Sequence, residues 1–163
     1  MPNKIYRATE TAVTFTDTTG TYALVLNNLA TATGRNSVSV DRGAGSLPYR
    51  YKWKAIIQWN VAPVIGDTAD IYLIESDGTY IDGVVNLAAG GVFTVGQSLN
   101  IKRIGAVRAQ AATASTNYIA SGVCNIFERY YGVGVFNGSA QALKATNNVS
   151  MVILTPMPDE IQD

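Results

Sequence analysis

The sequence contains no histidine and only one cysteine, Cys124. The absence of histidine excludes Ser-His-Asp and Cys-His catalysis and removes the usual general base near neutral pH. It also removes the commonest ligand of zinc and other transition metals. A single cysteine cannot form an intrachain disulfide, and its apolar neighbours indicate a small buried hydrophobic residue. We therefore predict a protein that is not an enzyme, with no catalytic residues, no metal site and no cofactor.

Charged residues are also scarce. They make up 15% of the chain, against about 25% in an average protein, and 12 basic residues balance 12 acidic ones. Zero net charge argues against nucleic-acid binding, because phosphate affinity comes from clustered lysine and arginine. With 47% hydrophobic residues the chain is too apolar to be disordered. A surface so poor in charge favours packing against neighbouring molecules, and a neutral soluble protein is the alternative.

The few charges are unevenly distributed along the chain. Residues 1–60 contain seven basic and three acidic residues, a balance of +4, so the remainder carries −4. The acidic part ends in Asp159, Glu160 and Asp163. A basic front and an acidic tail are either complementary surfaces between copies or an accidental spread.

Long apolar runs are absent as well. No stretch approaches the roughly 18 apolar residues of a membrane-spanning helix, and no basic start is followed by an apolar segment. We therefore expect no membrane partner, no secretory signal and synthesis in a reducing cytoplasm.

The clearest structural signal is the alternation of residue types between positions 49 and 60. Odd positions are aromatic or aliphatic, and even positions, apart from Ile56, are basic or amide side chains. A period of two predicts a long strand with one core face and one face toward solvent or a partner. Aromatic stripes can also stack on sugars, but Ala55 and Ile57 continue this stripe and favour a core. The residues that could bind a sugar are Trp53, Trp59 and Tyr131.

Further strand signals, separated by turn clusters, occur throughout the chain. The segments are 21–26, 37–40, 69–75, 98–108, 117–127, 132–136 and 149–155. A change of phase at Lys102 and Arg103 predicts a bulge or a bend. The best helix signal is 139–145, two turns at most. This pattern predicts a single-domain antiparallel β-sandwich, jelly-roll-like, over residues 21–156. Before it, the Thr-rich segment 1–20 is an extended N-terminal arm or a loose terminus, and after it 157–163 is a short acidic tail.

The carboxylates offer two weak chemical hypotheses. A pair of carboxylates can hydrolyse glycosides, and only Glu75 and Glu128 lie at the ends of apolar runs without a turn to explain them. Glu75, Asp77 and Asp82 could supply oxygen ligands to calcium, but their spacing matches no calcium loop and favours hairpin turns. Asn137 and Asn148 begin glycosylation sequons, which mean little without a secretory signal.

The order of features over residues 50–156 has a parallel in one group of proteins. The segments are YKWKAIIQWNVAP, then GDTADIYLIESDGTYIDG, then YYGVGVFNGS, and finally NNVSMVILTP. The chain resembles small β-sandwich structural proteins of tailed bacteriophages that lie on or near the head. The resemblance implies an oligomeric, non-enzymatic particle component, such as a decoration (cement) protein, located in the virion. It supplies no functional residues.

We therefore expect a capsid decoration or cement protein that forms a homo-oligomer, with a trimer as the first expectation. It would bind the major capsid protein or other virion proteins and bridge capsid subunits through strand edges and an N-terminal arm. A tail, fibre or head-to-tail connector subunit is the first alternative. A carbohydrate-binding module is the alternative from another class.

Overall fold

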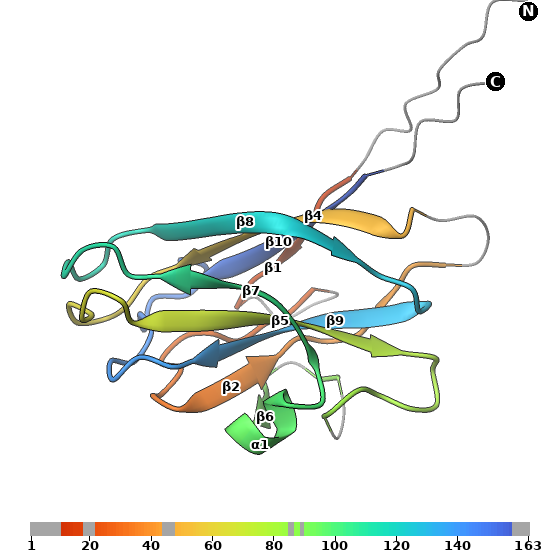
Figure 1. Ribbon diagram of the computed structural model, residues 1–163, viewed down its shortest axis with the longest axis horizontal. Helices are drawn as coiled ribbons and strands as arrows, with labels where there is room; N and C mark the ends of the chain where they lie inside the picture. Colours follow the sequence, from red (N-terminus) through yellow and green to blue (C-terminus); the bar gives the residue numbers. More distant parts are fainter. Residues whose placement is uncertain (1–10, 18–21, 44–47, 85–86, 89, 158–163) are drawn as a thin grey trace, which may run out of the picture.

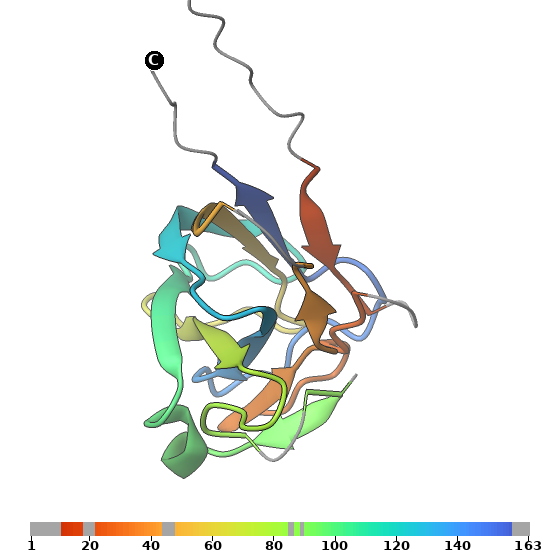
Figure 2. The same cartoon turned by 90° about the vertical axis from the view of Figure 1, so that its right-hand side faces the viewer.

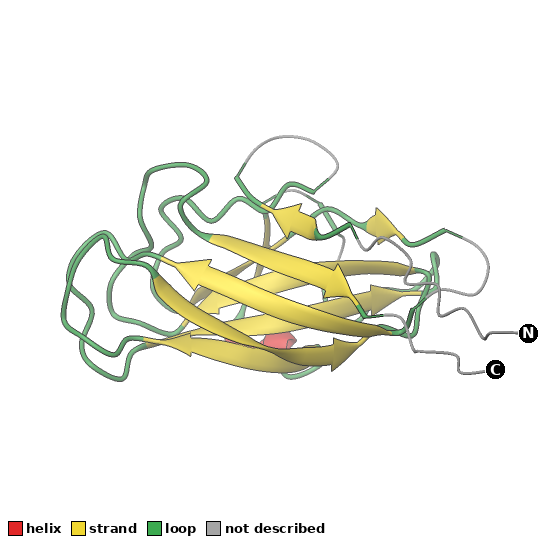
Figure 3. Cartoon of the chain, turned by 90° about the horizontal axis from the view of Figure 1, so that it is seen from above, coloured by secondary structure: helices red, strands yellow, loops and turns green. Residues whose placement is uncertain are grey.

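The structure is a computed structural model that describes residues 11–17, 22–43, 48–84, 87–88 and 90–157. Two antiparallel sheets pack as a sandwich, and their strands follow the long axis of the molecule (Figures 1 and 3). The four-stranded sheet has the order β1 (Val13–Phe15), β10 (Met151–Pro156), β4 (Arg50–Ile57), β8 (Tyr118–Asn125). The six-stranded sheet has the order β6 (Gly91–Phe93), β2 (Thr33–Asn36), β9 (Tyr130–Asn137), β5 (Thr68–Ser76), β7 (Lys102–Arg108), with β3 (Val40–Asp41) also paired to β9. The predicted all-β sandwich is confirmed.

The strand pairing follows a nested scheme. With β3 and β6 set aside, eight strands remain, and the first pairs with the last, the second with the seventh, and so inward. The pairs are β1 with β10, β2 with β9, β4 with β8, and β5 with β7. One long hairpin that rolls up in this way is a jelly roll, as the sequence predicted.

Strand β4 shows how the sequence builds the core. Along it exposed and buried residues alternate, and Tyr51, Trp53, Ala55 and Ile57 are buried. The regular strand ends at Ile57, although Trp59 is also fully buried. The aromatic stripe is therefore the core face of the strand, as the alternation favoured.

The indole of Trp53 fills the seam where the edge strands β7 and β8 of the two sheets meet. Gly105 on β7 and Gly122 on β8 both contact this ring, and a Cβ on either glycine would overlap it. In β7, the register skips Ile104 between Arg103 and Gly105, which is the irregularity that the change of phase predicted. Glycines on both sides let the two sheets close around one large aromatic residue.

A second apolar cluster lies on the outer face of the six-stranded sheet. Tyr72, Ile74 and Phe136 point away from the main core and pack against the described residues of the segment 81–101, called the cover segment below. From this segment Val84, Phe93 and Ile101 are buried in the cluster. The cover segment includes β6 and the helix α1 (Val95–Ser98), and it lies on the side of the molecule away from β4 and β8 (Figures 1 and 2).

The four-stranded sheet begins inside the segment that the sequence assigned to a possible arm. Phe15 in β1 is fully buried, and the Asp17 carboxylate accepts the amide N–H groups of Leu26, Asn27 and Asn148. Residues 13–17 therefore belong to the sandwich. The rest of the predicted arm, 1–10 and 18–20, lies outside the described residues, and so does the acidic tail beyond Met157.

The predicted helix at 139–145 is wrong. The side chain of Asn137 binds the carbonyl of Gln141, and the amide of Leu143 donates to the Leu29 carbonyl, so this segment is held as a loop. Leu143 is fully buried there, and its backbone pairs with that of Trp59 in an isolated bridge. Helix α1 occurs instead after Thr94, whose side chain and that of Gln97 form a capping box.

Candidate contact surfaces

The two carboxylates considered for hydrolysis reach the same loop but have different surroundings. The Glu75 side chain is buried, and its Oε1 accepts the amide N–H groups of Phe127 and Glu128. Glu128 itself is exposed. Glu75 therefore holds the connection between β8 and β9 in place, which is a structural use of its charge.

The residues considered for calcium are used in a turn. The Asp77 carboxylate accepts the amide N–H groups of Thr79 and Tyr80 at 2.7 and 2.8 Å, which lowers its pKa. The Asp82 amide donates to the Glu75 carbonyl. Among the described residues no group of three or more Asp, Glu or Cys side chains could hold a metal ion. The hairpin interpretation thus accounts for these residues.

The residues considered for sugar binding lie inside the sandwich. Trp53, Trp59 and Tyr131 are buried, so none of them can stack on a ligand at the surface.

Burial also raises the pKa of the Cys124 thiol to about 11, as expected for an inert internal cysteine. The Asn137 side chain is fully buried and donates to the carbonyls of Leu29 and Gln141, so it cannot be a glycosylation site in the folded protein.

What the sequence did place correctly is the outward face of β4. Arg50, Lys52 and Lys54 are exposed on it and alternate with the buried aromatic stripe. The neighbouring strand β8 contributes Ile119 and Val123, which remain 51% and 50% exposed. We call these five residues the basic face.

The register defines how the basic face is arranged. Lys52 lies opposite Val123, and Ile119 lies opposite Ile56, so cations and aliphatic side chains share one flat surface. On the other side, β10 places Ile153 beside Lys54 and Thr155 beside Lys52. Every described residue that points outward from this sheet is neutral or basic.

The three cations of the basic face have no partner among the described residues. The ion pairs of the described chain are Arg103 with Asp70 and Arg129 with Asp41, and both lie elsewhere. The side chains of Arg50, Lys52 and Lys54 also make no hydrogen bond to another described residue. An apolar surface with unpaired cations suits a partner that brings carboxylates.

A second exposed surface lies on the cover segment. Val92 on β6, Val95 on α1 and Leu99 just after α1 are all exposed, Val95 to 64% and Leu99 to 82%. Val95 and Leu99 are four positions apart, so they lie on one side of the helical turn. We call Val95 and Leu99 the aliphatic patch. Val92 is not part of it, because its partner Arg35 lies opposite Val135, on the face of the sheet that Phe93 does not occupy. The aliphatic patch lies on the opposite side of the sandwich from β4 and β8 (Figure 2).

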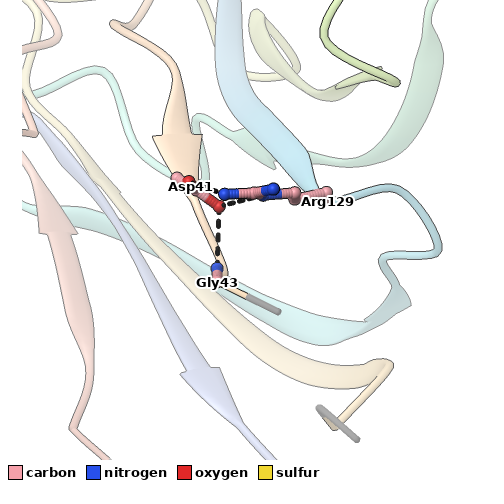
Figure 4. A network of polar contacts seen from close by, with 3 residues as sticks. All are labelled: Asp41, Gly43 and Arg129. Atoms are coloured by element: carbon pink, nitrogen blue, oxygen red, sulfur yellow. Dashed lines mark hydrogen bonds and ion pairs between the residues drawn. The ribbon is translucent and has the colours of Figure 1, made fainter. Parts of the chain in front are cut away.

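One end of the sandwich is held by a bidentate ion pair. Arg129 donates from Nε and Nη2 to the Asp41 carboxylate at 2.9 and 2.8 Å, and the Gly43 amide donates to the same carboxylate (Figure 4). The Arg129 hydrogen bonds lower the pKa of Asp41 to about 2, and Asp41 in turn raises the pKa of Arg129. Nearby, Arg42 donates to the carbonyls of Ile126 and Glu128. These contacts fasten the chain after β3 to the loop between β8 and β9.

The same end carries an exposed aromatic pair. The rings of Tyr49 and Phe127 are stacked, with centroids 6.4 Å apart and planes inclined by 10°. The ammonium of Lys102 lies 5.4 Å from the centroid of the Phe127 ring. Sequence reasoning missed this pair, because its two residues are 78 positions apart and meet only through the pairing of β4 with β8.

Comparison with known proteins gives little. No protein family matches the sequence, and no curated protein is similar to it. Among solved structures with some likeness is a sugar-binding protein described as the EclA C-terminal domain. It is 11% identical with a TM-score of 0.35, and the match covers 96% of this chain and 81% of that one. A likeness at this level carries no information about function. Among the described residues, no helix has the length and apolar character needed to cross a membrane.

Proposed function

We propose that this chain is a structural protein of a tailed-bacteriophage virion, a decoration or cement subunit that binds the assembled head. A cement subunit holds at least two neighbours, so it needs at least two contact surfaces. The observation that carries the proposal is that the jelly roll exposes two such surfaces on opposite sides, the basic face and the aliphatic patch. The resemblance to phage head proteins over residues 50–156 points the same way.

The mechanism is adhesive. A subunit that binds only the assembled shell stabilises it by mass action, without any chemical step. Zero net charge removes long-range repulsion between many copies on one particle. When a partner covers exposed aliphatic side chains such as Leu99, the complex is stabilised by about 25 cal/mol per Å² of buried apolar area.

The test uses head particles of the phage whose genome encodes this chain, stripped of the protein. The purified protein is added back, and bound copies are counted after sedimentation. Decoration predicts hundreds of copies per particle and a rise in the temperature at which the head ruptures. About 3 to 12 copies, by closed-ring symmetry, would instead favour the fibre or connector alternative. Absence of binding to any virion part would contradict the proposal.

The aliphatic patch has a matched control. V95S/L99S removes two exposed aliphatic side chains from the patch, whereas V64S/I65S removes two others, exposed to 64% and 67%, from the loop before β5. We expect V95S/L99S to reduce the copies bound at a fixed concentration at least tenfold, through lost apolar contact. V64S/I65S should bind as the original does. Equal binding by both variants would exclude the patch as a contact.

The proposed arm requires a shorter deletion than the sequence indicated. Removing residues 1–20 would also remove β1 and the buried Phe15, and so damage the sheet. Deletion of residues 1–10 leaves β1 intact. If the arm contributes to bridging, this deletion lowers particle binding while thermal unfolding stays unchanged; unchanged binding would remove the arm from the mechanism.

A second candidate function, glycan binding, is favoured by one observation, the exposed stacked pair Tyr49 and Phe127 beside Lys102. Aromatic faces of this kind can stack on sugar rings. Because both tryptophans are buried, tryptophan quenching is a poor probe, and a glycan array read with F127A as control is the suitable test. Binding that disappears in F127A would support this candidate, and no binding to any glycan would end it.

A further inference from the structure

The unpaired cations of the basic face have a counterpart in the chain's own sequence. Residues 158–163, Pro-Asp-Glu-Ile-Gln-Asp, hold three of the 12 acidic residues of the chain within six positions. The described residues contain ten basic and eight acidic side chains, so they carry a net charge of +2. The zero net charge of the whole chain therefore depends on this acidic segment.

The direction of β10 determines where the acidic segment starts. Met151 lies opposite Ile56 and Pro156 opposite Tyr51, so β10 runs toward the Arg50 end of β4. Met157 then donates its amide N–H to the Arg50 carbonyl at 2.8 Å. At Met157 the chain is heading away from Lys52 and Lys54. It would have to reverse direction to reach those two lysines of its own sheet, whereas the basic face of another molecule imposes no such reversal.

We propose that the basic face binds the acidic segment 158–163 of a second copy of this chain. An extended backbone would place Asp159, Ile161 and Asp163 on one side, since side chains alternate with a period of two. That side would then present carboxylate, aliphatic and carboxylate groups in turn, which complements the mixed cations and aliphatics of the basic face. Six extended residues span roughly 20 Å, whereas four strands at about 4.8 Å spacing form a narrower sheet. The segment is therefore long enough to cross the four-stranded sheet.

The contact is heterologous, because each copy gives a segment and receives one at a different place. Heterologous contacts close into a ring when the rotation between copies allows it, and this is the expected form of the predicted homo-oligomer. The inference rests on the proposed function in one respect, in that it takes the basic face to be a contact surface. It assigns that surface to a neighbouring copy and leaves the aliphatic patch to the shell.

The experiment measures the mass of the full chain in solution by size exclusion with light scattering. We expect an oligomer at 0.1 M salt that dissociates toward monomer at 1 M, because the screening length falls from about 10 Å to about 3 Å. K52E/K54E and D159K/E160K should each weaken self-association at least about tenfold, since attraction becomes repulsion. The combined variant K52E/K54E/D159K/E160K restores opposite charges and should associate again.

R108E/K144E serves as the control for K52E/K54E, because it makes the same change in net charge at two residues outside the basic face. It should keep the oligomer. Circular dichroism and thermal unfolding check that every variant is folded.

Three results would overturn the inference: a wild-type monomer at all concentrations, an oligomer unaffected by D159K/E160K, or a combined variant that stays monomeric. Particle binding is read separately, so the two proposals fail independently. A wild-type monomer that still coats heads would remove this inference and leave the proposed function standing. A salt-sensitive oligomer that binds no virion part would do the reverse.

Discussion

The outer face of the six-stranded sheet is apolar and is covered by residues 81–101, whereas the outer face of the four-stranded sheet is basic and aliphatic and stays exposed. Both sheets pack their inner faces into one core, so the difference concerns the outer faces alone. An apolar cover on β4 would bury Lys52 and Lys54, and burying unpaired charge costs several kcal/mol per ion. The charges therefore keep this face uncovered in the isolated chain, which is what the proposed contact with a carboxylate-bearing segment requires.

The largest expected effect comes from breaking the covered face. Phe93 is fully buried between Tyr72, Phe136 and the backbone of Gly134. Phe93→Ala should lower the free energy of unfolding by about 3–5 kcal/mol, because it leaves a cavity between cover and sheet. Urea denaturation followed by circular dichroism measures this loss. Val92→Ala, one residue earlier and exposed, is the control and should change it by less than about 0.5 kcal/mol. A loss below about 1 kcal/mol in Phe93→Ala would mean that the cover contributes little to the fold.

The next effect tests the seam where the two sheets meet. A methyl group at Gly105 would overlap the Trp53 indole, so Gly105→Ala should cost about 1–3 kcal/mol of stability through overpacking. The smaller ring in W53F/G105A should recover part of that loss. Gly96→Ala is the control, since the nearest atom to its added methyl is Thr94 Oγ1 at 3.8 Å. If Gly105→Ala were neutral, the indole would have to be free to move within the seam.

The pH dependence of stability sharpens the comparison at the end that joins the two sheets. Asp41 has a folded-state pKa of about 2, below the ordinary aspartate value of 3.8, because of its hydrogen bonds from Arg129 and Gly43. A lowered pKa gives stability that is present above about pH 4 and is lost as pH falls toward 2. The effect should be small because both side chains are largely exposed. Thermal unfolding of Asp41→Asn should show a shallower fall over this range, and an unchanged fall would assign the pH dependence to other carboxylates.

The sequence predicted the features that depend on neighbouring residues along the chain, and it did not predict those that depend on which strands pair. The period of two in β4 predicted both its core stripe and its outward cations, because strand geometry is local. Short strands separated by turns at fairly regular intervals predicted the jelly-roll-like sandwich, but the order of the strands in each sheet became known only from the structure. The β8 half of the basic face was not predictable, since Gly122 interrupts the inward apolar series of this strand and only the pairing with β4 brings Val123 beside Lys52.

Other features were hidden for tertiary reasons. The cover segment lacks a period, because its buried residues come from a loop, a short strand and a helical turn. The helix signal at 139–145 failed because the buried Asn137 side chain offers that loop better partners than a helix would. The Thr-rich start concealed β1, whose three residues are too short to show alternation.

The smallest expected effect on stability belongs to the aliphatic residues of the basic face. Ile119 and Val123 already expose half of their surface, so I119S/V123S should change the free energy of unfolding by no more than about 0.5 kcal/mol per site in urea denaturation. The same variant should weaken self-association, because it removes the apolar part of the proposed contact while leaving all three cations. Substitutions on the basic face should therefore change self-association with little change in the free energy of unfolding. Substitution of Phe93 on the covered face should mainly lower the free energy of unfolding. A loss of more than about 2 kcal/mol in I119S/V123S would mean that the isolated chain already covers this face, and the contrast between the two sheets would then fail.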